Sequence, residues 1–91
     1  MIYTIITSKS AECVIKKWKK SSPNLFKKYQ KIYKELIEHP RTGIGHPEPL
    51  VGGNSILYSR HISAHDRIIY EIHDDIITVL VLDVEGHYND K

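Results

Sequence analysis

The chain has 91 residues, of which 41% are hydrophobic and 26% charged, and its formal net charge is +2. This length predicts a single domain spanning residues 1–91, and the composition is that of a soluble globular protein rather than a disordered or membrane-embedded one. The sequence contains no apolar run near the roughly 18 residues of a membrane span and begins without a signal peptide. Its one cysteine, Cys13, cannot form an internal disulfide, so a cytoplasmic protein is expected.

The charges are divided unevenly along the chain. Residues 1–41 carry ten lysines and arginines against three glutamates, giving +7, whereas residues 42–91 carry three basic and eight acidic residues, giving −5. A basic half is typical of a surface that binds nucleic acid, because phosphate attraction supplies most non-specific affinity. A solvated helical face explains the lysines equally well, so charge alone leaves both interpretations open.

The N-terminal segment predicts a strand followed by a helix. Residues 2–7 are rich in β-branched side chains, which favour a strand. Either Ser8 or Ser10 can cap the helix that follows. Its apolar residues recur at helical spacing and are Ala11, Val14, Ile15 and Trp18.

A second helix is predicted from Ser22 and Pro23 to Glu38 or His39, where Pro40 ends it. Its apolar stripe of period 3.6 comprises Leu25, Phe26, Tyr29, Ile32, Tyr33, Leu36 and Ile37. Since both tyrosines lie on this stripe, they are expected at the edge of the core rather than in a base-stacking platform.

The C-terminal half predicts a loop followed by three strands. Residues 40–54 hold three prolines and four glycines and show no periodicity, which indicates a functional or disordered loop. The β runs 55–62, 67–73 and 76–83 are joined by short turns and predict an antiparallel meander. The expected fold is therefore α+β with the order βααβββ, in which two helices pack on one face of a mainly antiparallel sheet.

The alignment of the first two strands of the meander determines which basic side chain lies beside Arg67 on the exposed face of the sheet. The apolar residues of both strands are expected to face the helices. An odd number of connecting residues, or a bulge, then places His61 beside Arg67 on the exposed face, whereas an even number places Arg60 there. The sequence leaves both arrangements open.

Two short motifs stand out from these elements. Glu48 lies between Pro47 and Pro49, which hold the backbone on both sides of it extended, and the pair His87-Tyr88 follows the last apolar run. Taken singly, such a glutamate is usually a solvated surface residue and a histidine near a C-terminus is usually part of a mobile end. The histidines show no metal-ligand spacing on one element, so neither a metal nor a cofactor is expected.

Four segments together resemble the Txe/YoeB branch of the RelE-like toxins. They are residues 45–50 (GHPEPL), 58–62 (YSRHI), 65–72 (HDRIIYEI) and 86–88 (GHY), in matching order and spacing. The resemblance implies a RelE-like fold and a ribosome-dependent mRNA endonuclease of a type II toxin–antitoxin system, which cuts mRNA in the ribosomal A site without metal. It also implies neutralisation by a small YefM/Axe-like antitoxin and leaves homodimerisation open.

The family's catalytic residues can be carried over to the matching positions. The resemblance implies Glu48 as general base, Arg67 as the cation at the transition state, His87 as general acid and Tyr88 as the residue that aligns or stacks on the RNA. These residue types suit metal-free cleavage, which needs a base for the 2′-OH proton, a cation for charge on phosphorus and an acid for the leaving 5′-oxygen.

The chain also departs from the family pattern. Ser59-Arg60-His61 stands where members often have Ser-Arg-Arg, and Val51 follows the Pro-Glu-Pro-Leu motif where some members have a lysine shortly after it. Arg60 and His61 are expected to contact RNA. The lysine-rich helices are expected to compensate for the missing cations by docking on ribosomal RNA through Lys16, Lys17 and Lys20.

A second hypothesis belongs to another functional class. The chain could be a catalytically inactive RelE-like module that binds RNA or a protein through the same basic surface. The histidine at position 61 supports this hypothesis, since it replaces a permanent cation.

Overall fold

The computed structural model describes residues 2–50 and 56–86 of the chain. Its elements are β1 (Thr4–Thr7), α1 (Lys9–Ser21), α2 (Pro23–Glu38), β2 (Glu48–Pro49), β3 (Leu57–His61), β4 (Asp66–His73), the short 3₁₀ helix η1 (Asp74–Ile76) and β5 (Thr78–Gly86). The predicted α+β order is confirmed, with β2 as an additional strand inside the segment predicted to be a loop. No helix in this part of the chain is long and apolar enough to cross a membrane.

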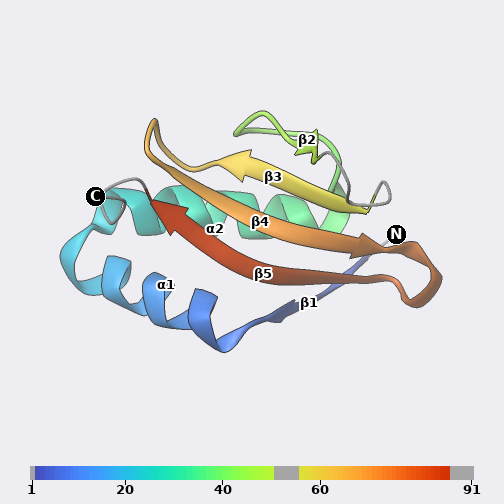
Figure 1. Cartoon of the computed structure of the whole chain (residues 1–91), viewed down its shortest axis with the longest axis horizontal. Coiled ribbons are helices and arrows are strands. Elements are labelled where there is room, and N and C mark those ends of the chain that lie inside the picture. The colour runs from blue at the N-terminus through green and yellow to red at the C-terminus, as the bar shows by residue number, and fades with distance from the viewer. Residues whose placement is uncertain (1, 51–55, 87–91) are drawn as a thin grey trace.

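The five strands form one mixed sheet in the order β1-β5-β4-β3-β2. β1 runs parallel to β5, whereas the other three pairs are antiparallel, so the predicted meander is confirmed as β3-β4-β5. The two helices connect β1 to the rest of the sheet, with α2 behind β3 and β4 and α1 beside β5 (Figure 1). The sheet therefore keeps one face covered by helices and leaves the other open.

The helix boundaries follow from their capping residues. Ser8, rather than Ser10, caps α1, because its Oγ accepts a hydrogen bond from Ala11 N at 3.2 Å and donates one to Leu82 O at 2.7 Å. The N–H of Ser22 donates to Trp18 O at 2.8 Å and closes α1 immediately before Pro23 begins α2. α2 ends at Glu38, one of the two predicted positions.

The third strand of the meander lies later in the sequence than predicted. It spans Thr78–Gly86 instead of 76–83, because η1 and a left-handed residue, Ile77 with φ 49°, extend the turn after β4. A bulge opposite the Ile69/Tyr70 step of β4 then adjusts the register. Because of this bulge, the valines of β5 stay buried on the helix side along the strand.

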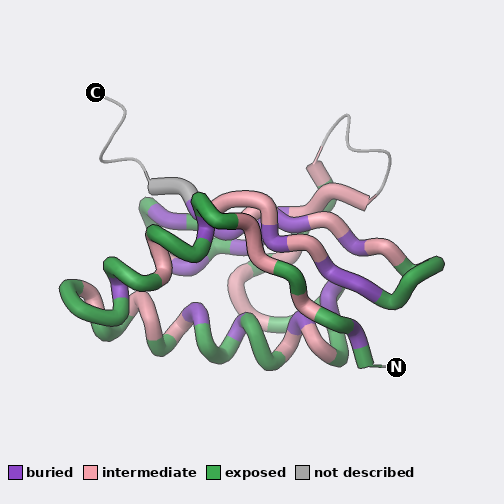
Figure 2. The backbone as a smooth tube through the Cα atoms, turned by 90° about the horizontal axis from the view of Figure 1, so that it is seen from below, coloured by how far each residue is buried: buried purple, intermediate pink, exposed green. Residues whose placement is uncertain are grey.

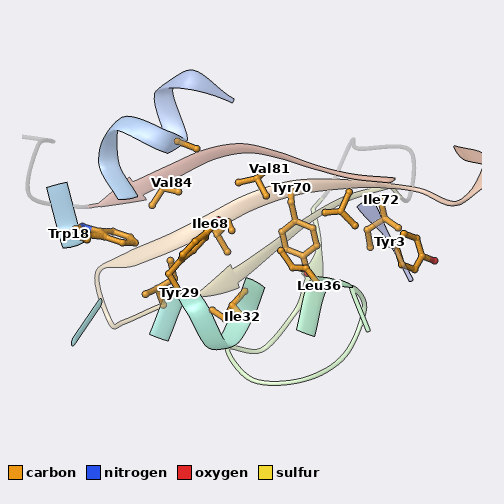
Figure 3. Close-up of a cluster of buried hydrophobic side chains, with 13 residues drawn as sticks. Tyr3, Trp18, Tyr29, Ile32, Leu36, Ile68, Tyr70, Ile72, Val81 and Val84 are labelled. Carbon is orange, nitrogen blue, oxygen red and sulfur yellow. The ribbon is translucent and has the colours of Figure 1, made fainter. Parts of the chain in front are cut away.

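The hydrophobic core lies between the helices and the covered face of the sheet. Buried positions recur along one stripe of each helix and along the central strands (Figure 2). The core runs from Trp18 at one end to Tyr3 at the other, with Ile32 and Tyr70 between them (Figure 3). Tyr29 is buried in the core as predicted, whereas Tyr33 is 37% exposed and lies outside the core cluster, with its ring 6.1 Å from that of Tyr29.

Candidate active site

Glu48 lies on an edge strand, with its backbone held by β3. Glu48 pairs with Ser59 and Pro49 pairs with Tyr58, while Leu50 N donates to Leu57 O at 2.8 Å. The extended backbone predicted for this motif is thereby confirmed, and β2 occupies the sheet edge, where prolines are tolerated. The Glu48 side chain is exposed.

The register of β3 and β4 decides between the two arrangements that the sequence left open. His61 pairs directly with Arg67, and both side chains are exposed. Ser59, the partner of Glu48, lies two residues before His61 and so points to the same face. Glu48, His61 and Arg67 therefore share the open face, on three adjacent strands, with the directly opposed pair roughly 5 Å apart at Cβ.

Arg60 lies on the other face of β3 and is completely buried. Its Nε donates to Tyr70 Oη at 3.0 Å, Nη1 donates to Glu35 Oε1 at 2.7 Å and Ile44 O at 3.3 Å, and Nη2 donates to His39 O at 2.7 Å and Thr42 O at 2.8 Å. All five N–H donors of the guanidinium thus have acceptors inside the protein. A completely buried side chain cannot contact RNA, so the structure does not support the RNA contact expected for Arg60.

The segment that leads into β2 makes close contacts that only glycine allows. Gly43 has φ +123°, and a Cβ there would collide with Glu35 Oε1. Gly45 has φ +84°, and a Cβ there would meet His61 O at 2.5 Å, while its own carbonyl accepts from His61 N at 2.7 Å. The two glycines let the loop lie directly against Glu35 and β3.

A second polar cluster ties the start of this loop to the far end of the sheet. Arg41 Nη2 donates to Asp74 Oδ2 at 2.7 Å, and the Tyr3 hydroxyl donates to Asp74 Oδ1. The pKa of Asp74 is lowered, first by its hydrogen bond with Arg41 and then by that with Tyr3, whereas Asp74 raises the pKa of Tyr3. The cluster connects β1, the loop and η1.

The predicted ribosome-docking lysines lie elsewhere on the molecule. Lys16, Lys17 and Lys20 are exposed on α1, on the helix side of the sheet, and are not brought together with Glu48 or Arg67. A hollow of about 290 Å³ lies on that side too, between α1 and α2 at the start of β4. The lysines and the hollow therefore lie apart from the candidate active site, which is the open face of the strands.

The C-terminal pair is the remaining part of the predicted site. β5 ends at Gly86, opposite Asp66 and next to the start of β4. His87 and Tyr88 lie outside the described residues, so their assignments stay predictions. Residues 2–50 and 56–86 contain no group of three or more histidine, cysteine, aspartate or glutamate side chains that could hold a metal ion.

Sequence reasoning missed the buried network around Arg60, although one signal for it was present. Tyr58 and Ile62 flank Arg60 at a spacing of two, so strand alternation favours the buried face for Arg60, and the register with β4 decides it. Its partner Glu35, on α2, could not be identified in this way, because that contact joins residues 25 positions apart.

Comparisons with known proteins agree with this geometry. A sequence profile described as the YoeB-like toxin of bacterial type II toxin-antitoxin systems matches residues 9–88. Toxin YoeB of Escherichia coli is 32% identical over 71 residues, which make up 78% of this chain and 82% of that protein.

Solved structures show the same arrangement of elements. The YoeB/ParE toxin from Agrobacterium tumefaciens superposes with a TM-score of 0.83 at 24% identity, covering 93% of this chain and 99% of that one. The YoeB dimer from Staphylococcus aureus gives a TM-score of 0.81 at 25% identity, covering 97% and 100%. The YoeB-YefM complex from the same organism gives 0.78 at the same identity and coverage.

Proposed function

The chain belongs to the YoeB-like toxins of bacterial type II toxin-antitoxin systems, and on that premise we propose that it is an mRNA endonuclease that cleaves translated mRNA on the ribosome. The observation that carries the proposal is the common face of Glu48, His61 and Arg67 on adjacent strands. Rigid strands hold functional groups more accurately than free loops do. The proposed reaction needs no metal.

Each step of the reaction has a residue proposed for it. Glu48 removes the proton of the 2′-OH, whose oxygen attacks phosphorus while the bond from phosphorus to the 5′-oxygen breaks. Arg67 stabilises the negative charge that develops on the phosphoryl oxygens. His87 donates a proton to the leaving 5′-oxygen, and Tyr88 aligns or stacks on the RNA. The products are a 2′,3′-cyclic phosphate and a 5′-hydroxyl.

The open shape of the site supports dependence on the ribosome. Glu48, His61 and Arg67 are exposed on a strand surface, so this surface does not by itself enclose an RNA strand. A bound ribosome can hold the mRNA in a fixed geometry against that face, which supplies the orientation that a shallow site lacks. The A site is the place where a codon is presented in this way.

An antitoxin of the YefM kind is the proposed partner. The Staphylococcus aureus relative is solved as a YoeB-YefM complex and also as a YoeB dimer. A flexible acidic segment with apolar anchors would suit the basic helices of this chain and could cover the open face. Homodimerisation is proposed on the same comparison.

The test is cleavage of mRNA on purified bacterial ribosomes, with 5′ ends mapped after incubation with wild type, Glu48→Ala, Arg67→Ala or His87→Ala. Wild type should create new ends within codons in the A site, and each variant should lower the cleavage rate by roughly 10²-fold or more. Glu38→Ala, an exposed change at the end of α2, serves as the matched control and should cleave like wild type.

The alternative is a catalytically inactive RelE-like module that binds RNA or protein. The exposed His61, in place of a permanent cation, is the observation that favours it. Wild type that folds and binds ribosomes but creates no new 5′ ends would establish this alternative and reject the endonuclease.

A further inference from the structure

We propose that the buried Arg60 and the half-buried Glu35 form a lock that positions Glu48 from the helix side of the sheet. The inference rests on the proposed function, because it gives Glu48 the part of general base. Neither Arg60 nor Glu35 lies on the open face, so both are positioning residues rather than catalytic ones. What they position is the chain between α2 and β2.

Arg60 and Glu35 bind the backbone of that chain at three residues. Arg60 binds the carbonyl oxygens of His39, Thr42 and Ile44 at 2.7, 2.8 and 3.3 Å. Glu35 Oε1 accepts from Ile44 N at 2.9 Å while it also accepts from Arg60. One carboxylate oxygen therefore joins the guanidinium to the loop backbone.

Tyr70 completes the lock from the neighbouring strand. Its hydroxyl accepts from Arg60 Nε at 3.0 Å and donates to Pro40 O at 2.8 Å. Burial raises the pKa of Tyr70, so the hydroxyl keeps the proton that it donates to the loop. The loop is thus bound at four carbonyl oxygens and one amide by side chains within the fold.

Backbone hydrogen bonds to β3 continue from this loop to the strand that carries Glu48. Immediately after Ile44, Gly45 O accepts from His61 N at 2.7 Å, and three residues later Glu48 pairs with Ser59. The strand residue between Ser59 and His61 is Arg60 itself. The side chain of Arg60 therefore points inward and binds the loop. The backbone of its two neighbours, Ser59 and His61, binds the segment that carries Glu48.

The residue types match this task and no shorter side chain could perform it. Lysine offers three donors from a single nitrogen and cannot reach five acceptors spread over α2, β4 and the loop. A buried guanidinium needs an acceptor for each of its donors, and three of the five acceptors of Arg60 are carbonyl oxygens of this loop. A displacement of the catalytic group by about 1 Å can lower a reaction rate by roughly 10²-fold.

The test compares Glu35→Ala, which removes the shared acceptor, with Glu35→Gln, which keeps an oxygen there, and with Glu38→Ala as a surface control on the same helix. Glu35→Ala should lower kcat on programmed ribosomes by roughly 10- to 100-fold with KM unchanged. Glu35→Gln should retain kcat within about fivefold of wild type, because oxygen can still accept from Arg60 and Ile44.

A double-mutant cycle with Glu48 separates positioning from general loosening of the fold. If Glu35 acts through Glu48, then Glu35→Ala should cause no further loss of rate in a Glu48→Ala background. A double variant whose loss equals the product of the two single losses would overturn the proposal.

Amide hydrogen exchange gives a second readout that needs no cleavage. Glu35→Ala should accelerate exchange at His61 and Leu50, the amides that join β3 to the loop and β2, while Ser8 N, bonded to Val81 O, stays protected. Unchanged exchange at His61 and Leu50 would show that the lock does not hold β2. If wild type fails to cleave, the endonuclease proposal fails, and exchange still decides whether the lock exists.

Discussion

His61 is the residue of the open face whose part in RNA binding the geometry makes testable. It lies directly opposite Arg67 on the open face, where a second permanent cation would extend the positive surface. An imidazole is positively charged only in acid solution, whereas a guanidinium is charged throughout the usual pH range. An arginine at position 61 would therefore place a second permanent positive charge beside Arg67.

The variant His61→Arg should bind ribosomes more tightly than wild type, by about 1 kcal/mol or roughly fivefold. Ribosome binding measured by sedimentation or fluorescence anisotropy provides the comparison. His39→Arg adds the same charge at the end of α2 and is the control. Equal gains for the two variants would remove His61 from the RNA-contacting set.

Asp74 gives a second prediction at the scale of a residue, this time for stability. Its pKa is lowered from the ordinary value of 3.8 by Arg41 and then by Tyr3, so the folded state favours the ionised form. A depressed carboxyl pKa stabilises the fold above the ordinary value, and this contribution is lost as the pH falls through the folded-state pKa.

Asp74→Asn should therefore lower the melting temperature at pH 7, and this difference should shrink as the pH falls below the ordinary carboxyl value of 3.8 and the wild-type carboxyl takes up a proton. Thermal unfolding of both proteins across this pH range measures the difference. Asp75→Asn removes the neighbouring charge and should give a smaller change. A destabilisation by Asp74→Asn that persists undiminished at pH 2 would show that packing, not ionisation, is responsible.

At the scale of an element, the start of α1 shows how one of two equivalent-looking serines becomes the cap. Ser8 Oγ both accepts from Ala11 N and donates to Leu82 O, so it caps the N-terminus of α1 and also joins this helix to β5. Ser8→Ala should lower the free energy of unfolding by about 1–2 kcal/mol. Ser10→Ala should change it by less than about 0.5 kcal/mol.

Chemical denaturation of the two serine variants decides the matter directly. Ser10 lies inside the first turn, where its Oγ is 3.3 Å from Ser8 Oγ, and alanine is favourable in a helix. If Ser10→Ala were the more destabilising change, the capping assignment would have to move to Ser10. The slope of the denaturation curve should be the same for both, since neither change alters the surface buried on folding.

The elements differ in how far the sequence alone could predict them. α1, α2 and the meander follow from local periodicity and capping residues, and all were predicted close to their observed bounds. β2 was not, because two residues become a strand only by pairing with β3. The shift of β5 has a similar origin, since η1 and the left-handed Ile77 depend on the surrounding turn.

The candidate site, too, could be predicted only where local sequence patterns determine it. Glu48 and Arg67 could be singled out by motif, and alternation limited the partner of Arg67 to Arg60 or His61. The choice between these two required the register, which depends on how residues 62–65 fold back. The Arg60–Glu35 contact joins β3 to α2 and depends on packing that no local pattern encodes.

At the scale of the whole molecule, the two surfaces proposed to be functional lie on opposite sides of one sheet. The open face carries Glu48, His61 and Arg67, whereas the exposed lysines of α1 lie with the helices on the covered side. A partner that contacts both must therefore extend around the molecule. Ribosomal RNA is large enough to do so, and a flexible antitoxin segment can follow the same path.

This arrangement predicts that binding and cleavage can be separated by mutation. Lys16→Glu, Lys17→Glu and Lys20→Glu together reverse charges that lie far from the open face, so they should weaken ribosome binding without changing the rate of cleavage once bound. The melting temperature should stay close to that of wild type, because all three side chains are exposed. KM should rise while kcat remains unchanged.

Salt dependence provides the measurement that identifies the lysine contacts as phosphate contacts. Each phosphate neutralised on a duplex contributes about 0.9 to the slope of log K against log salt, so loss of three contacts should reduce that slope by roughly 2–3. Reversal of Lys27, Lys28 and Lys31 on α2 matches the change in charge and is the control for non-specific attraction. Equal losses from the two triple variants would indicate long-range attraction by net charge. An unchanged affinity after reversal on α1 would restrict the RNA-binding surface to the open face, and the lysines would then be a solvated helical face.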